Sequence, residues 1–138
     1  MAMQFKIITP LRTALETEVL GILLPGTEGE MEILPGHADL ISSVANGELI
    51  YRPTAGERKS LFVGGGFLQV ESDRILLVTD TALESGEINT DSVEEAIARA
   101  KETIKNSASV MSREEITYLE AVLAKQMAML DYRKKRHP

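Results

Sequence analysis

The chain has 138 residues, 43% of them hydrophobic but only 4% aromatic, and it contains neither Cys nor Trp, so we expect an aliphatic core and exclude disulfides and thiolate metal sites. Its net charge of −6 is uneven, because residues 1–87 carry 6 basic and 13 acidic side chains whereas residues 88–138 carry 9 and 8. The acidic N-terminal part argues against nucleic acid or anionic lipid as a direct partner and is compatible with a basic protein surface; we also expect neither a secretory signal nor a membrane-spanning segment.

Residues 3–81 read as a series of short strands separated by turn signals. Asn46-Gly47, the segment 53–57 and Ser72-Asp73 are typical of turns, and the runs between them are rich in β-branched and aliphatic residues. No helical periodicity interrupts this region, and turns recur about every eight to twelve residues, as they do in sandwiches and barrels. We therefore predict an all-β N-terminal domain.

The stretch 28–40 stands out because a turn, a short strand and a second turn follow one another within it. Gly29 and Gly36 tolerate positive φ, and Pro35-Gly36 marks a sharp, solvent-facing turn that carries His37. Three carboxylates lie just upstream, at Glu28, Glu30 and Glu32. Such a polar loop around two apolar residues is typical of a presented contact surface, although a Pro-Gly turn can also merely reverse the chain.

After residue 86 the periodicity changes to that of two helices. Ser92-x-x-Glu95 and Ser112-x-x-Glu115 both match the capping box of a helix start, and the polar segment 106–109 lies between them. The apolar side chains at helical spacing are Val93, Ala96, Ile97, Ala100 and Ile104, and then Ile116, Leu119, Leu123, Met127 and Leu130. The short connection predicts a C-terminal antiparallel α-helical hairpin over residues 87–138, with a basic run near its end.

The sequence offers little catalytic machinery. His37 and His137 are its only histidines, and a catalytic or metal site on His37 would need partners from distant strands. Gly64-Gly-Gly66 lacks the Lys and hydroxyl of a P-loop, so we interpret it as a place where strands bend or pack closely. The three carboxylates before His37 lack the ligand spacing of a Ca²⁺ loop. We expect no metal, no cofactor and no enzyme activity.

Three segments, taken together, resemble one family. Residues 29–38 read Gly-Glu-Met-Glu-Ile-Leu-Pro-Gly-His-Ala, residues 63–70 read Val-Gly-Gly-Gly-Phe-Leu-Gln-Val, and residues 78–82 read Val-Thr-Asp-Thr-Ala. In this order and spacing, with a helical hairpin after them, they resemble the ε subunit of bacterial F-type ATP synthases, called δ in mitochondria. The resemblance covers nearly the whole chain. It implies a β-sandwich of about ten strands over residues 1–86, followed by the hairpin.

The resemblance further implies a non-catalytic rotor subunit of the central stalk, peripheral to the cytoplasmic face of the bacterial inner membrane. It would couple proton transport through the c ring to ATP synthesis, with the sandwich bound to the γ subunit and the c ring. The residues implied at the c ring are Glu28, Glu30, Met31, Glu32, Pro35, Gly36 and His37. A free-standing β-sandwich adaptor that binds a protein partner through its hairpin is the alternative.

In this family the hairpin is a switch that inhibits ATP hydrolysis when it extends along γ into the α/β catalytic hexamer. The residues implied at γ or the hexamer are Ile116, Leu119, Leu123, Met127, Leu130, Arg133, Lys134, Lys135 and Arg136. Some members bind ATP at the first helix through an Ile/Leu-Asp-x-x-Arg-Ala motif. Here Asn89, Ser92 and Val93 replace its Asp, Arg and Ala, so the cation that would meet phosphate is missing and we predict no bound nucleotide.

Overall fold

The computed structural model describes residues 1–136, which leaves His137 outside the described residues. The chain divides into two compact units, Met1–Glu84 and a second that begins at Ser85. The division therefore lies two residues before the position expected from the sequence. Within the described residues, no helix is long and apolar enough to cross a membrane.

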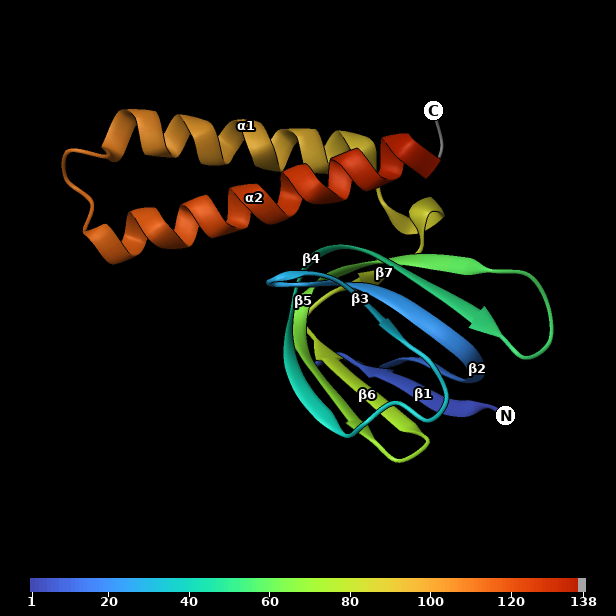
Figure 1. Cartoon of the computed structure of the whole chain (residues 1–138). Coiled ribbons are helices and arrows are strands. Elements are labelled where there is room, and N and C mark those ends of the chain that lie inside the picture. The colour runs from blue at the N-terminus through green and yellow to red at the C-terminus, as the bar shows by residue number, and fades with distance from the viewer. Residues whose placement is uncertain (137–138) are drawn as a thin grey trace. The chain divides into compact units, whose positions relative to one another are not determined.

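The first unit is built from seven strands and contains the predicted all-β fold (Figure 1). The strands are β1 (Met3–Ile8), β2 (Thr13–Gly26), β3 (Gly29–Ile33), β4 (Leu40–Pro53), β5 (Lys59–Glu71), β6 (Arg74–Thr79) and β7 (Ala82–Leu83). They follow the order β1-β6-β5-β4-β2-β3, and β1 also pairs with β2, so the sheet closes on itself. The β1–β6 pair is parallel, and the remaining pairs are antiparallel.

The structure has seven strands and not the expected ten or so, because β2, β4 and β5 are long and each continues past a point where the buried side chains switch between odd and even positions. In β4, Val44 is buried at an even position but Leu49 and Tyr51 are buried at odd ones. The change occurs around Asn46-Gly47, which we predicted as a turn and which instead pairs with β5 inside the sheet. Since β2 and β5 show the same change, counting these three strands twice gives ten segments.

The glycine stretch 64–66 marks the corresponding change in β5, as the sequence suggested. Residues before it pair with β7, and residues from Gly66 onward pair with β6. Gly66 has φ of 142°, and a Cβ placed on it would lie 1.9 Å from the Val78 carbonyl oxygen. The two backbones therefore approach so closely that no side chain fits between them.

The second unit contains a 3₁₀ turn, η1 (Ser85–Glu87), and two helices, α1 (Thr90–Ser107) and α2 (Arg113–Arg136), that pack antiparallel (Figure 1). The capping box predicted at Ser92 is wrong, because the side chain of Asn89 accepts the Ser92 amide at 3.0 Å and caps the helix three residues earlier. The cap predicted at Ser112 is confirmed, since its hydroxyl accepts the Glu115 amide at 3.1 Å.

The packed face of α2 differs from the predicted stripe at its C-terminal half. Ile116, Leu119, Leu123 and Leu130 are half-buried, but Met127 is 44% exposed. The most buried residues of this helix are Met129 and Tyr132, which the predicted spacing left out. The apolar and small residues of α2 are distributed around the whole helix. Its sequence therefore has no single apolar face that would identify the buried side.

Candidate functional site

The loop after β3 holds His37 in a defined geometry. Pro35 and Gly36 occupy the centre of a turn in which the His37 amide donates to the Leu34 carbonyl at 3.1 Å, and Gly36 has the predicted positive φ of 86°. The His37 Nδ1 lies 2.7 Å from the Ala38 carbonyl oxygen, which can only accept. Nδ1 therefore carries the proton in this bond, and Nε2 is the imidazole nitrogen left for a partner.

Two further contacts fix this loop to the sandwich. A Cβ on Gly21 would lie 2.9 Å from Leu34 Cδ2, so the absence of a side chain at Gly21 makes room for Leu34. At the other end, Asp39 Oδ1 accepts the Ser72 amide at 2.9 Å and joins the loop to the turn between β5 and β6. Sequence reasoning missed Asp39, because an isolated Asp in a polar loop carries no signal of a distant partner.

The remaining residues of the predicted c-ring set are spread along β3. Glu30 and Glu32 are exposed, whereas Met31 lies on the opposite face and packs against the core. Glu28 is in the turn before β3, six residues from Leu34, or about 20 Å at the usual rise of a strand. The structure therefore brings Pro35, Gly36 and His37 together but separates them from Glu28.

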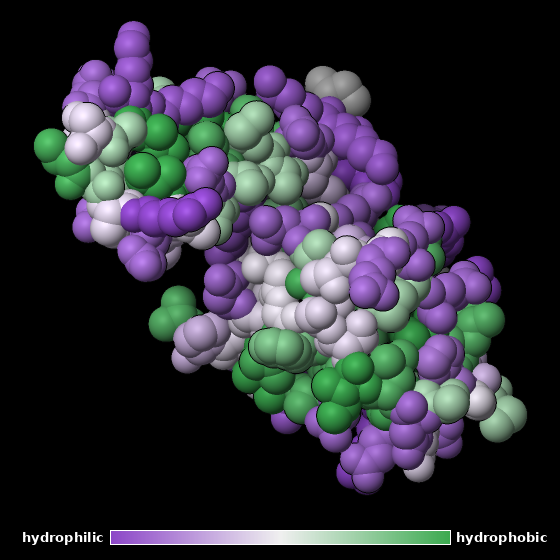
Figure 2. All heavy atoms as spheres, turned by 60° about the vertical axis from the view of Figure 1, so that its left-hand side comes forward, coloured by the Kyte–Doolittle hydropathy of each residue, from purple (hydrophilic) through white to green (hydrophobic). Residues whose placement is uncertain are grey.

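A second candidate surface is an apolar area on the outer side of β4, β5 and β6, which the sequence analysis did not single out. Ile41, Phe67 and Val78 are 75%, 65% and 47% exposed. Phe67 pairs directly with Val78 in the next strand, and Ile41 lies on the same face two residues from the partner of Phe67. We call these three residues the outer patch. Figure 2 shows apolar atoms gathered on this unit's surface.

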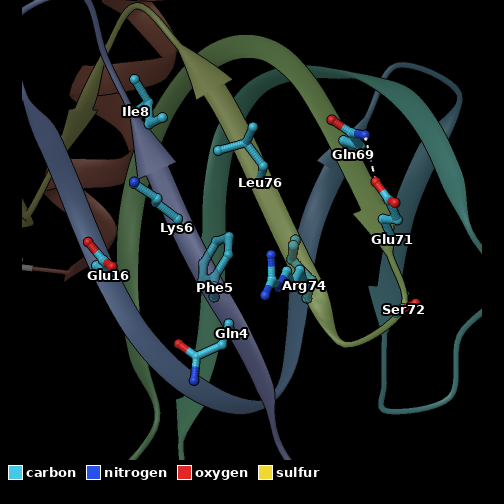
Figure 3. A pocket seen from close by; sticks show the side chains of 11 residues that line it. Gln4, Phe5, Lys6, Ile8, Glu16, Gln69, Glu71, Ser72, Arg74 and Leu76 are labelled. Atoms are coloured by element: carbon cyan, nitrogen blue, oxygen red, sulfur yellow. Dashed lines mark hydrogen bonds between the residues drawn. The ribbon is translucent and has the colours of Figure 1, made fainter.

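Two hollows adjoin the outer patch. One, of about 450 Å³, is lined by Val78, by the glycines 64–66 and by Thr9 and Pro10 of the β1–β2 loop. Leu11, which follows Pro10 in this loop, is 95% exposed. The other, of about 780 Å³, lies along the outer side of β1, β5 and β6 (Figure 3). Its lining includes Lys6, Glu16, Gln69, Glu71 and Arg74, and Gln69 donates to Glu71 at 3.4 Å. Charged and amide side chains of this hollow therefore lie beside the exposed apolar ones of the outer patch.

Among the described residues, no three His, Cys, Asp or Glu side chains gather so as to hold a metal ion. Burial, and secondarily the charge of Glu84, raises the pKa of Tyr51, but this side chain lies in the core with its ring edge-on to Phe5 at 6.3 Å. That shift reflects packing in the sandwich interior.

On α2, exposed apolar and small side chains accompany the buried ones. Tyr118 is 68% exposed, and Ala121 and Ala124 are exposed near Met127. In the basic run, Arg133 is half-buried and its Nε donates to the Ile88 carbonyl at 3.3 Å, while Lys134, Lys135 and Arg136 are exposed. The helix thus retains apolar surface beyond that which it buries against α1.

At the start of α1, the positions that match the nucleotide motif have structural roles. Asn89 caps the helix, Ser92 is exposed in its first turn, and Val93 is buried. No cation occupies the position where the motif has Arg.

Comparison of the sequence with known proteins yields a consistent set of relatives. Residues 2–85 match the family described as "ATP synthase, Delta/Epsilon chain, beta-sandwich domain". The "ATP synthase epsilon chain" of Dehalococcoides mccartyi is 36% identical, with 99% of this chain and 96% of the relative covered. The protein of the same name from Prochlorococcus marinus is 31% identical, with 88% and 95% covered.

Solved structures show the same fold. A chain of the Euglena gracilis mitochondrial ATP synthase, determined as OSCP/F1/c-ring, matches with a TM-score of 0.75 at 20% identity, covering 93% of this chain and 79% of its own. A chain from the central stalk/c-ring of the Tetrahymena thermophila enzyme matches with a TM-score of 0.66 at 14% identity, covering 99% and 96%.

Proposed function

Because this chain belongs to the ATP synthase delta/epsilon family, we propose that it is a rotor subunit that couples proton transport through the c ring to ATP synthesis in the catalytic hexamer. The observation that carries the proposal is the match over both units, since the D. mccartyi relative covers 99% of the chain. The epsilon chain is a non-catalytic stalk subunit, so the family supports the expectation that this chain is no enzyme. Its place would be peripheral, at the cytoplasmic face of the bacterial inner membrane.

The γ subunit is the proposed partner of the outer patch. Ile41, Phe67 and Val78 expose apolar area that burial would stabilise by roughly 25 cal/mol per Å². Soluble proteins seldom leave neighbouring large apolar side chains uncovered without a partner. The glycine-lined hollow and exposed Leu11 extend the surface, so that a protein with complementary relief can be held by shape as well as by apolar contact.

The c ring is the proposed partner of the loop around His37. Its turn hydrogen bond, the Leu34–Gly21 contact and the Asp39–Ser72 bond hold the loop in one conformation before binding. Such preorganisation lowers the entropy lost on association. The excess of acidic side chains in residues 1–87 would favour basic polar loops on the ring.

The hairpin is the proposed inhibitor of ATP hydrolysis. Exposed Tyr118 and Met127, together with small residues, leave α2 able to bury apolar surface on a new partner while it extends. Each helix has its own cap, at Asn89 and Ser112, so each can persist when the hairpin opens. The extended helix would meet γ and the hexamer, with Lys134, Lys135 and Arg136 supplying positive charge.

The test is ATP hydrolysis by the reconstituted catalytic complex containing either the full chain or a chain truncated after Glu87. Higher hydrolysis with the truncated chain, at equal assembly and coupling, supports an inhibitory hairpin. Equal hydrolysis would make the hairpin a static element and reject the inhibitory part. If neither form binds γ or the complex, the rotor function fails and the adaptor interpretation replaces it. A Phe67→Ser variant should lower γ binding, with exposed Glu57→Ala as its control.

A further inference from the structure

We propose that Asp39 is a positioning residue, which joins the His37 loop to the β5–β6 turn and thereby makes Ser72-Asp73 a second part of the surface that meets the c ring. The proposal rests on the proposed function, because the partner is the same. It adds a residue and a turn that lie outside the segment from Glu28 to His37, and it assigns Asp39 an action through its neighbours.

The bond itself joins two segments 33 residues apart in the chain. Asp39 Oδ1 accepts the backbone amide of Ser72 at 2.9 Å, a geometry within the range of a good hydrogen bond to a carboxylate. The turn is held from its other side as well, since the Gln4 amide donates to the Asp73 carbonyl at 2.7 Å. The loop, the turn and the start of β1 are therefore connected at one end of the sandwich.

Ser72 has a strained backbone. Its φ of 55° is the only positive value at a non-glycine residue among residues 1–136. This conformation is unfavourable for an L-residue, and it persists where surrounding contacts hold it in place. The Asp39 carboxylate supplies such a contact, because it binds the amide of the strained residue.

The pairing of Leu40 with Val70 brings the two segments near each other, and the Asp39 carboxylate then binds the Ser72 amide between them. Asp39, Ser72 and Asp73 are all exposed, and the core residues on either side, Val70 and Ile75, are already paired across β5 and β6. An exposed connection between two loops adds little to stability but fixes their relative position, which matters when both meet one partner.

The first test uses the full chain in isolation and compares Asp39→Asn with Asp39→Ala. Asn keeps the accepting Oδ1 and loses the charge, whereas Ala loses both. We expect the Ser72 amide to exchange with solvent about two- to tenfold faster in Asp39→Ala than in the native chain, and at the native rate within about twofold in Asp39→Asn. Glu57→Ala, an exposed change in the loop between β4 and β5, is the control. Unchanged exchange in Asp39→Ala would overturn the joining role.

The second test measures binding of the chain, bound to γ, to vesicles that contain the purified c ring, with ring-free vesicles as background. We expect Asp39→Ala to bind about two- to tenfold more weakly and Asp39→Asn to restore native binding, at unchanged melting temperature. Native binding by Asp39→Ala would overturn the proposal. Equal weakening in both variants would also overturn it, since the charge itself would then be the contact. Failure of the native chain to bind ring vesicles would reject the c ring as partner, and the amide exchange would still report on the loop connection.

Discussion

Replacing Gly66 by Ala tests the close approach of β5 and β6. The new Cβ would lie 1.9 Å from the Val78 carbonyl oxygen and 2.9 Å from its carbonyl carbon, so the neighbouring backbone has to move. An L-residue at the φ of 142° is strained as well. Strain of this kind costs about 1–3 kcal/mol and overpacking a further 1–3 kcal/mol, so we expect a loss of about 4 kcal/mol from the free energy of unfolding.

Gly56→Ala separates the two contributions. Gly56 has a similar φ of 118°, but nothing lies within 4 Å of a Cβ placed there. We therefore expect it to lose only the strain energy, about 2 kcal/mol. For a unit of this size a difference of about 2 kcal/mol corresponds to roughly 8–16 °C in melting temperature between the two variants.

The assay is thermal and urea unfolding of the full chain, followed through amide signals of β5 and β6 so that the helical unit does not contribute. The native chain provides the reference for both variants. If Gly66→Ala and Gly56→Ala melt within a few degrees of each other, the backbones of β5 and β6 are not in contact at Gly66, and the pairing of Gly66 with Thr79 is wrong.

Two further predictions concern single side chains. Burial and Glu84 raise the pKa of Tyr51 in the folded chain, so the unfolded chain loses this proton at a lower pH. We therefore expect the contribution of Tyr51 to the free energy of unfolding to be constant below about pH 10 and to fall as the pH rises further. Tyr51→Phe should flatten that fall in urea titrations carried above about pH 10, with about pH 8–9 as the reference where both chains should show no fall from this group; an equally steep fall would contradict the assignment. Asn89→Ala should cost about 1 kcal/mol and fray the first turn of α1 in amide exchange, whereas Ser92→Ala should stay within about 0.5 kcal/mol. The opposite order would restore Ser92 as the cap.

The types of the elements can be read from the sequence because their signals are local. Apolar residues that alternate with polar ones between Gly and Pro turns specify strands. A capping residue followed by apolar residues three and four positions apart specifies a helix, whichever elements later pack against it. For this reason the β domain, the helical hairpin, the turn at Pro35-Gly36 and the cap at Ser112 could all be predicted. The family resemblance likewise rests on short segments that are read directly from the chain.

Which side of each element faces the core depends on how the strands and helices pack together. Asn46-Gly47 has the composition of a turn, yet pairing with β5 keeps it in a continuous strand. Phe67 looks like a core residue, but Leu68 and Val70 already occupy the inward positions of β5, so Phe67 is left on the surface. The Asp39–Ser72 bond exists because β4 and β5 pair antiparallel with Leu40 opposite Val70, which brings residues 33 apart to the same end of the two strands. Such contacts depend on the pairing register of distant strands, which local composition does not specify.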